Sequence, residues 1–380
     1  MKKLASAIIG LLSLTGLPYL VYLGLYYLKQ PEGSPAKKGA VEPSISIVLP
    51  TYNEAQIVES KLEELVDLDY PLEKVEIVVV DSSDDDTPEI VEAFFEDREA
   101  PELTLIRETE RRGLAIALNE AYAAASNEVV VKTDCDSRIA VDALREAVAN
   151  LADPKVAAVT GRNAEVLGGS EVERRYRDIQ SIVQTLESHL DSTFIFHGPF
   201  SAFERDLIVP IDEDSIADDT ELALKIRKQG KRVVFDPAIK YKEAAHSSFG
   251  KRRQQKDRRA MGLLRLLWRQ RDMLGRYGNY GRTVLPFNWW FMIVSPWLVI
   301  ASIGLGVVAG FLLGGVPGFL LLGTLATALV LGSRDQLGPV QPLYSLFDTQ
   351  VSLFRASVLL LKGEGDGTWT VDQELRENFE

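Results

Sequence analysis

Two aspartates, Asp134 and Asp136, stand one residue apart directly after the run VVVKT. Alternate residues of an extended chain project to the same side, so both carboxylates can reach one ligand. Carboxylate oxygens suit a hard divalent cation such as Mg²⁺ or Mn²⁺, which can in turn bridge a diphosphate. A solvated turn is the other common setting of such a pair. The position directly after a β-branched run favours the metal site.

Other polar residues follow two further apolar runs. Tyr52 and Glu54 come after SISIVLPT, and Asp81 ends VEIVVVD. In open α/β sheets the carboxyl ends of the strands meet at the edge where ligands bind. Like charges gathered there repel each other unless a cation or hydrogen-bond donors are bound. No GxxxxGK[ST] or GxGxxG loop follows any of these runs, so the usual binding loops for nucleoside triphosphates and dinucleotides are missing. A nucleotide diphosphate held by a metal ion remains as the expected ligand.

The alternation of apolar runs with helical stretches predicts the sheet that positions these residues. The order predicts right-handed βαβ units and a mainly parallel, Rossmann-like sheet of the α/β class. The expected strands are residues 45–49, 75–80, 103–106, 129–131 and 156–160, and the expected helices are residues 54–68, 87–95, 114–125 and 141–151.

Two regions predict membrane helices. Residues 4–28 carry no charge and are long enough to cross a hydrocarbon core of about 30 Å. A cleaved signal peptide is the alternative, but the run is longer than an h-region and Lys29 follows it. Residues 284–313 and 319–331 predict a helical hairpin. Residues 343–361 have apolar positions at helical spacing, so they form either an interfacial helix or a third C-terminal membrane helix.

Charge is distributed unevenly along the 380 residues. Residues 53–153 hold 27 acids against 9 bases, and residues 225–282 hold 18 bases against 4 acids. A basic stretch before an apolar run is expected on the cytoplasmic surface. The net charge of −13 argues against nucleic acid as a partner, and the single Cys135 excludes an intramolecular disulfide.

Several segments together resemble the inverting GT-A glycosyltransferases of family two. They are SISIVLPTYNEAQIVESKLEEL, VEIVVVDSS, RGLAIALNEAYAAASNEVVVKTDCDS, IADDTELALKIRKQGKRVVFDP and RRQQKDRRAMG. The resemblance covers residues 44–262. With the flanking apolar helices, the chain looks like the membrane-embedded branch that includes cellulose and hyaluronan synthases.

The resemblance implies roles at the donor site. Tyr52 and Glu54 contact base and ribose, and Asp81 reads the base. Asp134 contacts ribose and, with Asp136, the Mg²⁺ or Mn²⁺ bound to the diphosphate. The position of His246 suggests a further ligand of metal or diphosphate, although a lone histidine is often structural. Lys132 and Arg112 are cations that either touch phosphate or serve as ordinary strand-edge and surface charges.

The resemblance also implies an acceptor site. Gly198 lies in HGPFSAFERDLI, which looks like the acceptor loop, and Asp219 matches the aspartate that acts as general base. Its neighbour Asp218 is expected to contact diphosphate or acceptor. A helix amino terminus also favours acids, so Asp218 and Glu221 can be terminal residues and Asp219 can have both roles.

The segment QQKDRR matches the QxxRW motif of the family except at its last position. Gln255 and Arg258 are expected to hold diphosphate and acceptor loop. Arg259 replaces the tryptophan that contacts the growing chain, and it too is expected to bind diphosphate or acceptor. Loss of that ring favours transfer of one or a few sugars over processive synthesis. A register shift that uses Trp268 is the alternative.

The expected organisation follows from these segments. It comprises a transmembrane helix (1–28), a linker (29–43), a cytosolic GT-A domain (44–248), a basic interfacial segment (249–283), a transmembrane hairpin (284–332) and a C-terminal helix with cytosolic tail (333–380). We expect a membrane enzyme of the hexosyltransferase type that uses a nucleotide-diphosphate sugar and a divalent metal. The acceptor is a glycan or a lipid-linked glycan, with polyprenyl phosphate as an alternative. An inactive nucleotide-sensing partner on the same fold is the alternative of another class.

Overall fold

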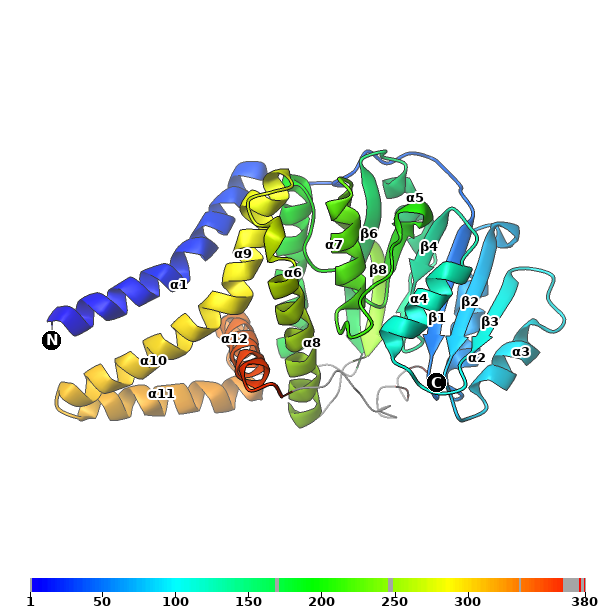
Figure 1. The fold of residues 1–380 in the computed structure, drawn as a ribbon. Coiled ribbons are helices and arrows are strands. Elements are labelled where there is room, and N and C mark those ends of the chain that lie inside the picture. The colour runs from blue at the N-terminus through cyan, green and yellow to red at the C-terminus, as the bar shows by residue number, and fades with distance from the viewer. Residues whose placement is uncertain are drawn as a thin grey trace.

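The computed structural model describes residues 2–167, 171–244, 249–334, 336–364, 376 and 379. Figure 1 shows a sheet with flanking helices on one side and a group of long helices projecting away from it on the other. Three further helices lie between these two parts. The projecting helices are α1 (Lys2–Lys29), α10 (Ser295–Leu312) and α11 (Val316–Ser333), and those between are α6 (Glu171–Leu190), α8 (Phe249–Arg269) and α12 (Gln341–Leu361).

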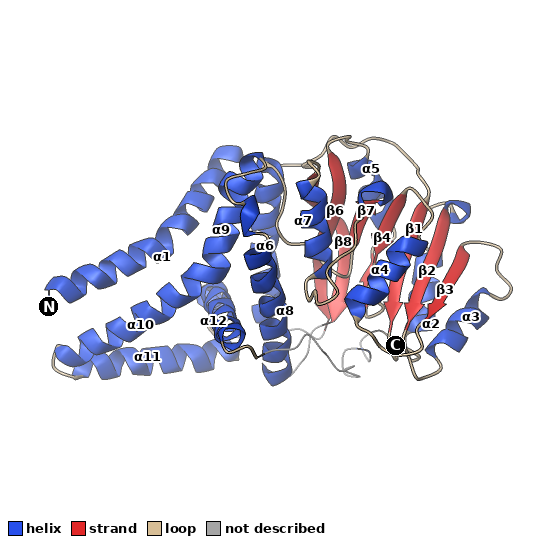
Figure 2. Ribbon diagram, in the orientation of Figure 1, coloured by secondary structure: helices blue, strands red, loops and turns tan. Residues whose placement is uncertain are grey.

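The sheet has eight strands in the order β3-β2-β1-β4-β7-β6-β8-β5 (Figure 2). The first four run parallel, β7 is antiparallel to β4 and β6, and β5 is antiparallel to β8. Because β2, β1 and β4 are adjacent, their carboxyl ends meet at one edge, as predicted. The strands are β1 (Ile45–Thr51), β2 (Val75–Asp81), β3 (Glu102–Arg107), β4 (Val129–Lys132), β5 (Ser137–Ile139), β6 (Val156–Leu167), β7 (Ser201–Glu204) and β8 (Arg232–Ala244).

Helices cover both faces of the sheet. Ile47 and Val79 contribute to one hydrophobic core, whereas Val48 and Val80 contribute to another. Burial on both faces explains why these strands are continuous apolar runs and not alternating ones. The covering helices are α2 (Val58–Val66), α3 (Thr87–Phe95), α4 (Leu114–Ala124), α5 (Ala143–Leu151) and α7 (Asp218–Lys228).

Three helices in the described part of the chain are long and apolar enough to span a membrane. They cover Ser6–Lys29, Tyr280–Leu312 and Val316–Ser333, and the second includes α9 (Leu285–Trp289). The turn between α10 and α11 contains Gly314 and Gly315 at φ 114° and 83°, a backbone conformation that favours glycine. The two apolar helices α10 and α11 therefore pack against each other across a tight turn.

Helix α12 is not among these three spans. It packs along α6 and α8 and also contacts α10. Ion pairs join it to α8: Asp348 to Arg253 and Lys256, and Arg355 to Asp257 at 2.9 Å. Asp348 is buried in these contacts, whereas Arg355 remains more than half exposed. The interfacial and membrane-spanning alternatives for residues 343–361 both stay predictions.

Candidate active site

Two loops at the carboxyl edge of the sheet are tied together. Asn53, at φ 55°, donates its N–H to Ser83 Oγ (2.8 Å), and its side-chain oxygen accepts the N–H of Asp84 (3.0 Å). The N–H of Glu54 donates to Thr87 Oγ1 (2.9 Å). These bonds also explain why α2 begins at residue 58 and not at residue 54 as predicted, because residues 53 and 54 bond to the neighbouring loop.

Asp81 is 2% exposed and accepts three hydrogen bonds. The hydroxyls of Thr51 and Ser83 lie 2.6 Å from its Oδ1, and the N–H of Ser83 lies 3.1 Å from its Oδ2. Tyr52 lies nearby in sequence and carries the Arg111 guanidinium 3.9 Å from its ring centroid. The sequence motifs indicated Arg112 as a candidate cation but gave no indication of its neighbour Arg111. It covers a ring that is expected to contact a nucleotide base.

Arg112 and Lys132, the two candidate phosphate-binding cations, have different surroundings. Arg112 pairs with Glu108 and Glu120, each at 2.7 Å, and is itself exposed. It is therefore a surface charge in this structure. The side chain of Lys132, in contrast, is 2% exposed. The structure favours the surface interpretation for Arg112 and places Lys132 in the site.

Asp134, Asp219 and Gly198 meet around the ammonium of Lys132. Nζ lies 2.7 Å from Asp134 Oδ1 and 3.4 Å from Asp219 Oδ2. A Cβ added to Gly198 would lie 2.7 Å from Asp134 Oδ2 and 3.2 Å from Asp219 Oδ2. Glycine therefore allows its loop to approach both carboxylates closely. Residues expected on the donor side and on the acceptor side share one small space.

Asp218 and Asp219 begin α7, and each has a buried carboxylate oxygen without a hydrogen-bond partner in the described structure. Burial raises the pKa of Asp219 to about 8; the Asp218 charge adds to this effect and Lys132 opposes it. Burial also raises the pKa of Asp218. A buried carboxylate with a raised pKa and a free oxygen has the properties of a general base.

The capping alternative for these acids receives little support. Ala217 is the N-cap of α7, and no side chain caps it. Glu221, one turn further, pairs with Lys225 at 2.8 Å and accepts the N–H of Asp212. Glu221 is therefore structural, whereas neither aspartate has the hydrogen bond of a cap.

Asp136 lies close enough to Asp134 and Glu54 for their charges to act on it. Burial raises its pKa to about 7; Asp134 and Glu54 add to the effect and Arg376 opposes it. Among the described residues no group of three or more acidic, histidine or cysteine side chains forms a ready metal site. Two carboxylates still fit a divalent ion that takes its other ligands from a diphosphate and water. His246, the expected third ligand, lies outside the described residues.

Glu54 has a partner that the sequence did not indicate. It is 6% exposed and forms two hydrogen bonds with Arg376, which is 3% exposed. The Nε–Oε2 distance is 2.5 Å, although the residues are 322 positions apart. A residue near the end of the sequence thus reaches the expected donor crevice.

Arg258 on α8 faces the same crevice. Burial and the neighbouring Arg259 lower its pKa, and the charges of Asp218, Asp134 and Asp136 oppose this effect. The structure therefore brings Arg258 near the carboxylates. Gln255 lies three residues earlier, and helical spacing places it on the same face of α8.

Arg259 occupies the position of the motif tryptophan and forms an ion pair with Glu243 of β8. Arg177 also pairs with Glu243, at 3.0 Å. Burial favours a higher pKa for Glu243, but the two arginines outweigh it and lower the value to about 2. Trp268 cannot replace the missing ring, because it lies nine residues, about 14 Å, further along the unbroken α8. It stacks on Trp289 at 6.1 Å.

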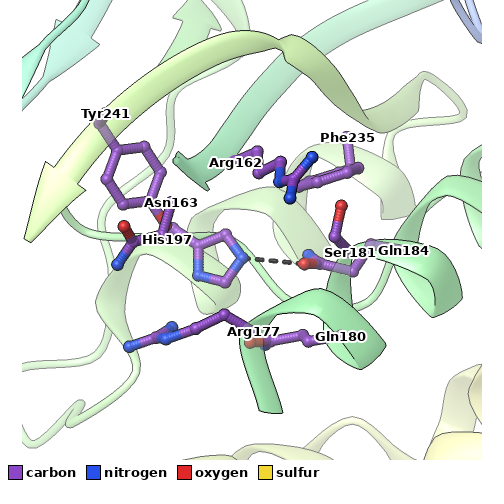
Figure 3. A pocket seen from close by; sticks show the side chains of 9 residues that line it. All are labelled: Arg162, Asn163, Arg177, Gln180, Ser181, Gln184, His197, Phe235 and Tyr241. Carbon is purple, nitrogen blue, oxygen red and sulfur yellow. Dashed lines mark hydrogen bonds between the residues drawn. The ribbon is translucent and has the colours of Figure 1, made fainter. Parts of the chain in front are cut away.

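Helix α6 holds the loop that carries Gly198. Gln184 donates to the carbonyl of Ile195 (2.7 Å), and its side-chain oxygen lies 2.9 Å from His197 Nε2 (Figure 3). Burial lowers the pKa of His197 to about 3, so the ring is neutral near pH 7 and Nε2–H donates. A cavity of about 10 Å³, enough for roughly one water, lies beside it. It is lined by Arg162, Asn163, Arg177, Gln180, Ser181, Gln184, His197, Phe235 and Tyr241.

The parallel strand ends and the carboxylates gathered there define a GT-A type domain, which is joined to three helices long and apolar enough to span a membrane. Comparison with known proteins agrees with this class. The family model for Glycosyl transferase family 2 matches residues 46–212. The solved structure of mannosyltransferase PcManGT from Pyrobaculum calidifontis, in complex with GDP-Man and Mn²⁺, matches with a TM-score of 0.80 and 30% identity over 95% of this chain and 100% of that chain.

Two bacterial relatives share the domain. Poly-beta-1,6-N-acetyl-D-glucosamine synthase of Staphylococcus aureus (strain COL) is 26% identical over 68% of this chain and 64% of its own length. The synthase of the same name from Staphylococcus epidermidis is 31% identical over 53% of this chain and 48% of its own length. The chain thus spans just under two thirds of the first relative and about half of the second. It belongs to glycosyltransferase family 2 and carries that family's glycosyltransferase domain.

Proposed function

We propose that this protein transfers a hexose from a nucleoside-diphosphate sugar to an acceptor hydroxyl, with inversion at the anomeric carbon. The single observation that carries the proposal is the meeting of Asp134, Lys132, Asp219 and Gly198 at the carboxyl edge of the sheet. A donor-side aspartate and a carboxylate with the properties of a base lie within reach of one cation. This arrangement suits direct displacement between two substrates held on opposite sides.

In this mechanism Asp219 accepts the proton of the acceptor hydroxyl as its oxygen attacks the anomeric carbon. The bond to the nucleoside diphosphate breaks on the opposite face, which inverts the configuration. Lys132 orients Asp219 and keeps a share of it ionised, because its positive charge opposes the effect of burial. Asp218 and the close approach of the Gly198 loop position the acceptor.

Tyr52, Glu54 and Asp81 are proposed to hold the nucleoside. The hydrogen bonds that fix Asp81 and the backbone of Glu54 prepare this side of the crevice before the donor binds. A divalent ion held by Asp134 and Asp136, Mg²⁺ or Mn²⁺, would neutralise charge on the departing diphosphate. Arg258, supported by Gln255, would contact the same diphosphate.

GDP-mannose is the donor to test first. The mannosyltransferase structure with GDP-Man and Mn²⁺ matches nearly the whole of this chain, including the helices outside the sheet domain. The GlcNAc-polymer synthases match shorter parts of both chains. We therefore rank a GDP-sugar before a UDP-sugar as donor.

The proposed acceptor is a short or lipid-linked glycan at the membrane. Arg259 forms an ion pair with Glu243. The position where the family motif has a tryptophan ring for the growing chain is therefore occupied by a paired charge. This supports transfer of one or a few sugars. The basic segment and three apolar helices support a multi-pass membrane protein with its catalytic domain on the cytosolic side.

The test is sugar transfer in native membranes with radiolabelled GDP-mannose or UDP-GlcNAc, with and without Mn²⁺. Mannose in a lipid-extractable product, lost with EDTA and absent in Asp219→Asn, is the expected result. A product that is a bare polyprenyl-phosphate monosaccharide would select that acceptor instead of a glycan. Donor binding without transfer under all conditions would contradict the proposal and favour the inactive nucleotide-sensing alternative.

A further inference from the structure

A buried carboxylate, Glu187 near the end of α6, joins the apolar helices to the sheet domain. Its side chain is 1% exposed. Oε1 accepts a hydrogen bond from Asn288 Nδ2 (2.6 Å), and Asn288 lies on α9, inside the apolar span Tyr280–Leu312. Oε2 accepts the hydroxyl of Thr193 (3.1 Å) and the N–H of Phe194 (3.0 Å). One carboxylate therefore bonds a helix of the apolar span on one side and a loop of the sheet domain on the other.

The loop that Glu187 holds carries Gly198; we refer to residues 193–200 as the Gly198 loop. The N–H of Phe196 in this loop donates to Thr220 Oγ1 (3.1 Å). Thr220 follows Asp219, the proposed base, on α7. Gly198 itself approaches the Asp219 carboxylate so closely that a Cβ would lie 3.2 Å from Oδ2. A displacement of the loop would therefore change the space in which the acceptor is expected to lie.

A second junction lies at Asp191, in the turn that follows α6. Oδ2 accepts the N–H of Tyr280, the first residue of the apolar span (3.2 Å), and Oδ1 pairs with Arg227 of α7 (3.1 Å). Arg227 is 6% exposed and also donates to the carbonyl of Tyr277 (2.8 Å). The end of α6 thus ties the apolar span both to the Gly198 loop and to the helix that carries the proposed base.

We propose that Glu187 is a positioning residue for sugar transfer: it fixes the Gly198 loop to α9, so the acceptor site depends on the placement of a membrane helix. The proposal rests on the function proposed above, in which the Gly198 loop positions the acceptor. Glu187 uses one carboxylate oxygen on each side, and a buried partner left without its hydrogen bond is costly, so the two sides are held in one arrangement. Such a link keeps the acceptor site aligned with the bilayer from which a lipid-linked acceptor arrives.

The experiment reverses donor and acceptor in the pair of Glu187 and Asn288. Asn288→Asp places a second carboxylate against Glu187, and Glu187→Gln leaves one oxygen to serve two sides. The double variant restores both links, because the amide of Glu187→Gln can donate to the carboxylate of Asn288→Asp while its oxygen accepts the bonds of the loop. The matched control is Ser302→Ala, since the Ser302 hydroxyl donates to the carbonyl of Leu298 in the same apolar helix (2.7 Å).

Three readouts separate positioning from folding and from donor binding. Each full-length protein is purified in detergent and assayed with GDP-mannose and a titrated extract of native membrane lipids as acceptor. Calorimetry with Mn²⁺ measures GDP affinity, and hydrogen exchange follows the peptide that contains residues 193–200. Thermal melts verify folding; if Asn288→Asp does not fold, Asn288→Leu removes the same bond without adding a charge.

We expect each single variant at Glu187 or Asn288 to lose about tenfold to 100-fold of kcat/KM for the acceptor with GDP affinity unchanged, because a small displacement of a positioning group has effects of this size. Exchange of the Gly198 loop should become faster in both. The double variant should recover transfer and slow exchange, and Ser302→Ala should match the wild type.

Unchanged transfer in the folded single variants, or a loss of transfer that the folded double variant does not recover, would overturn the positioning role and leave the proposed function intact. A merely structural role would lower the melting temperature and leave transfer per folded molecule unchanged. Absence of both GDP binding and sugar transfer in the wild type would overturn the proposed function, and the positioning role with it.

Discussion

The ammonium of Lys132 lies 3.4 Å from Asp219 Oδ2 and has its other contact with Asp134 Oδ1 at 2.7 Å. The lysine is buried, so these carboxylates are what stabilises its charge. One cation thereby links the aspartate expected at the ribose and metal to the proposed base. A change at Lys132 should consequently alter the protonation of Asp219.

Lys132→Met should move the acid limb of the pH profile to higher pH. Asp219 must be ionised to accept a proton, so activity rises as pH rises through its pKa. Burial has already raised that pKa to about 8, and Lys132 opposes the rise. Without the lysine the pKa rises further. The measurement is kcat/KM for sugar transfer between pH 6 and pH 10, roughly the range over which such a group titrates.

Lys74→Met is the matched control, because Lys74 pairs with Glu42 at 3.1 Å on the exposed surface. Its pH profile should equal that of the wild type. An acid limb that stays in place or moves to lower pH in Lys132→Met would show that Lys132 does not control the base.

Asp136→Asn should separate metal binding from folding. Mn²⁺-dependent nucleotide binding should be lost, because one of the two proposed carboxylate ligands is gone. Its raised folded-state pKa, about 7, means that Asp136 costs stability as pH rises from its unfolded value through 7. The amide does not ionise, so at pH 8 in EDTA the variant should melt at a higher temperature than the wild type. Unchanged Mn²⁺-dependent GDP affinity would remove Asp136 from the metal site.

Much of the sheet could be predicted because the apolar runs in the sequence coincide with strands that are buried in the fold. Strand β2 is apolar except for Glu76 and the terminal Asp81, and all of its residues are buried, so it could be predicted as a continuous run. Helix α3 has the predicted bounds of residues 87–95. Strands β5 and β7 were not predicted, because their short sequences SRI and SAFE lack the run of β-branched residues that marks the equally short β4.

The chemistry of the site was predictable only in part. The residues themselves could be named from motifs, but contacts such as Lys132 with Asp219 or Glu54 with Arg376 join positions 87 and 322 residues apart. Periodicity carries no information about such pairs. Helix α6, which supports the Gly198 loop through Gln184, was missed because its sequence contains no family motif. The ion pair of Arg259 with Glu243 could not be predicted from the sequence, because the two residues are joined only in the folded structure.

The orientation in the membrane gives a prediction about two reporter fusions. A reporter active only in the cytosol should give signal after Lys37 and also after Arg282, because the folded domain between them cannot straddle a bilayer. A reporter placed after Gly314, in the turn between α10 and α11, should be silent and serves as the control. Signal at Gly314 alone would place the domain outside the cytosol, away from the supply of nucleotide sugars.

Asp348 on α12 should matter although it lies outside the site. It pairs with Arg253 and Lys256 on α8, the helix that carries Gln255 and Arg258. Asp348→Asn should cost about 1–3 kcal/mol of folding free energy, because two partly buried cations lose their counter-ion. We expect a larger KM for the donor with a smaller change in kcat. Asp272→Asn, which breaks an exposed pair with Lys228, should change neither; equal behaviour of the two variants would contradict the role of α12.

Asp219 is the residue on which the proposed mechanism depends most, as the general base. Its side chain is buried, has one oxygen without a partner, and does not cap α7. Asp219→Asn preserves shape but cannot accept a proton. Donor and Mn²⁺ affinity should therefore remain, while transfer should fall by about 100-fold or more. Asp218→Asn, at the adjacent position of the same helix, should have a milder effect.

The most direct measurement is single-turnover sugar transfer at saturating donor for wild type, Asp219→Asn and Asp218→Asn, with thermal melts of each protein. We predict that Asp219→Asn binds donor normally, melts near the wild-type temperature or above it, and transfers sugar at about one hundredth of the wild-type rate or less. Transfer by Asp219→Asn at the wild-type rate would contradict the account, because proton removal from the acceptor would then not depend on this carboxylate.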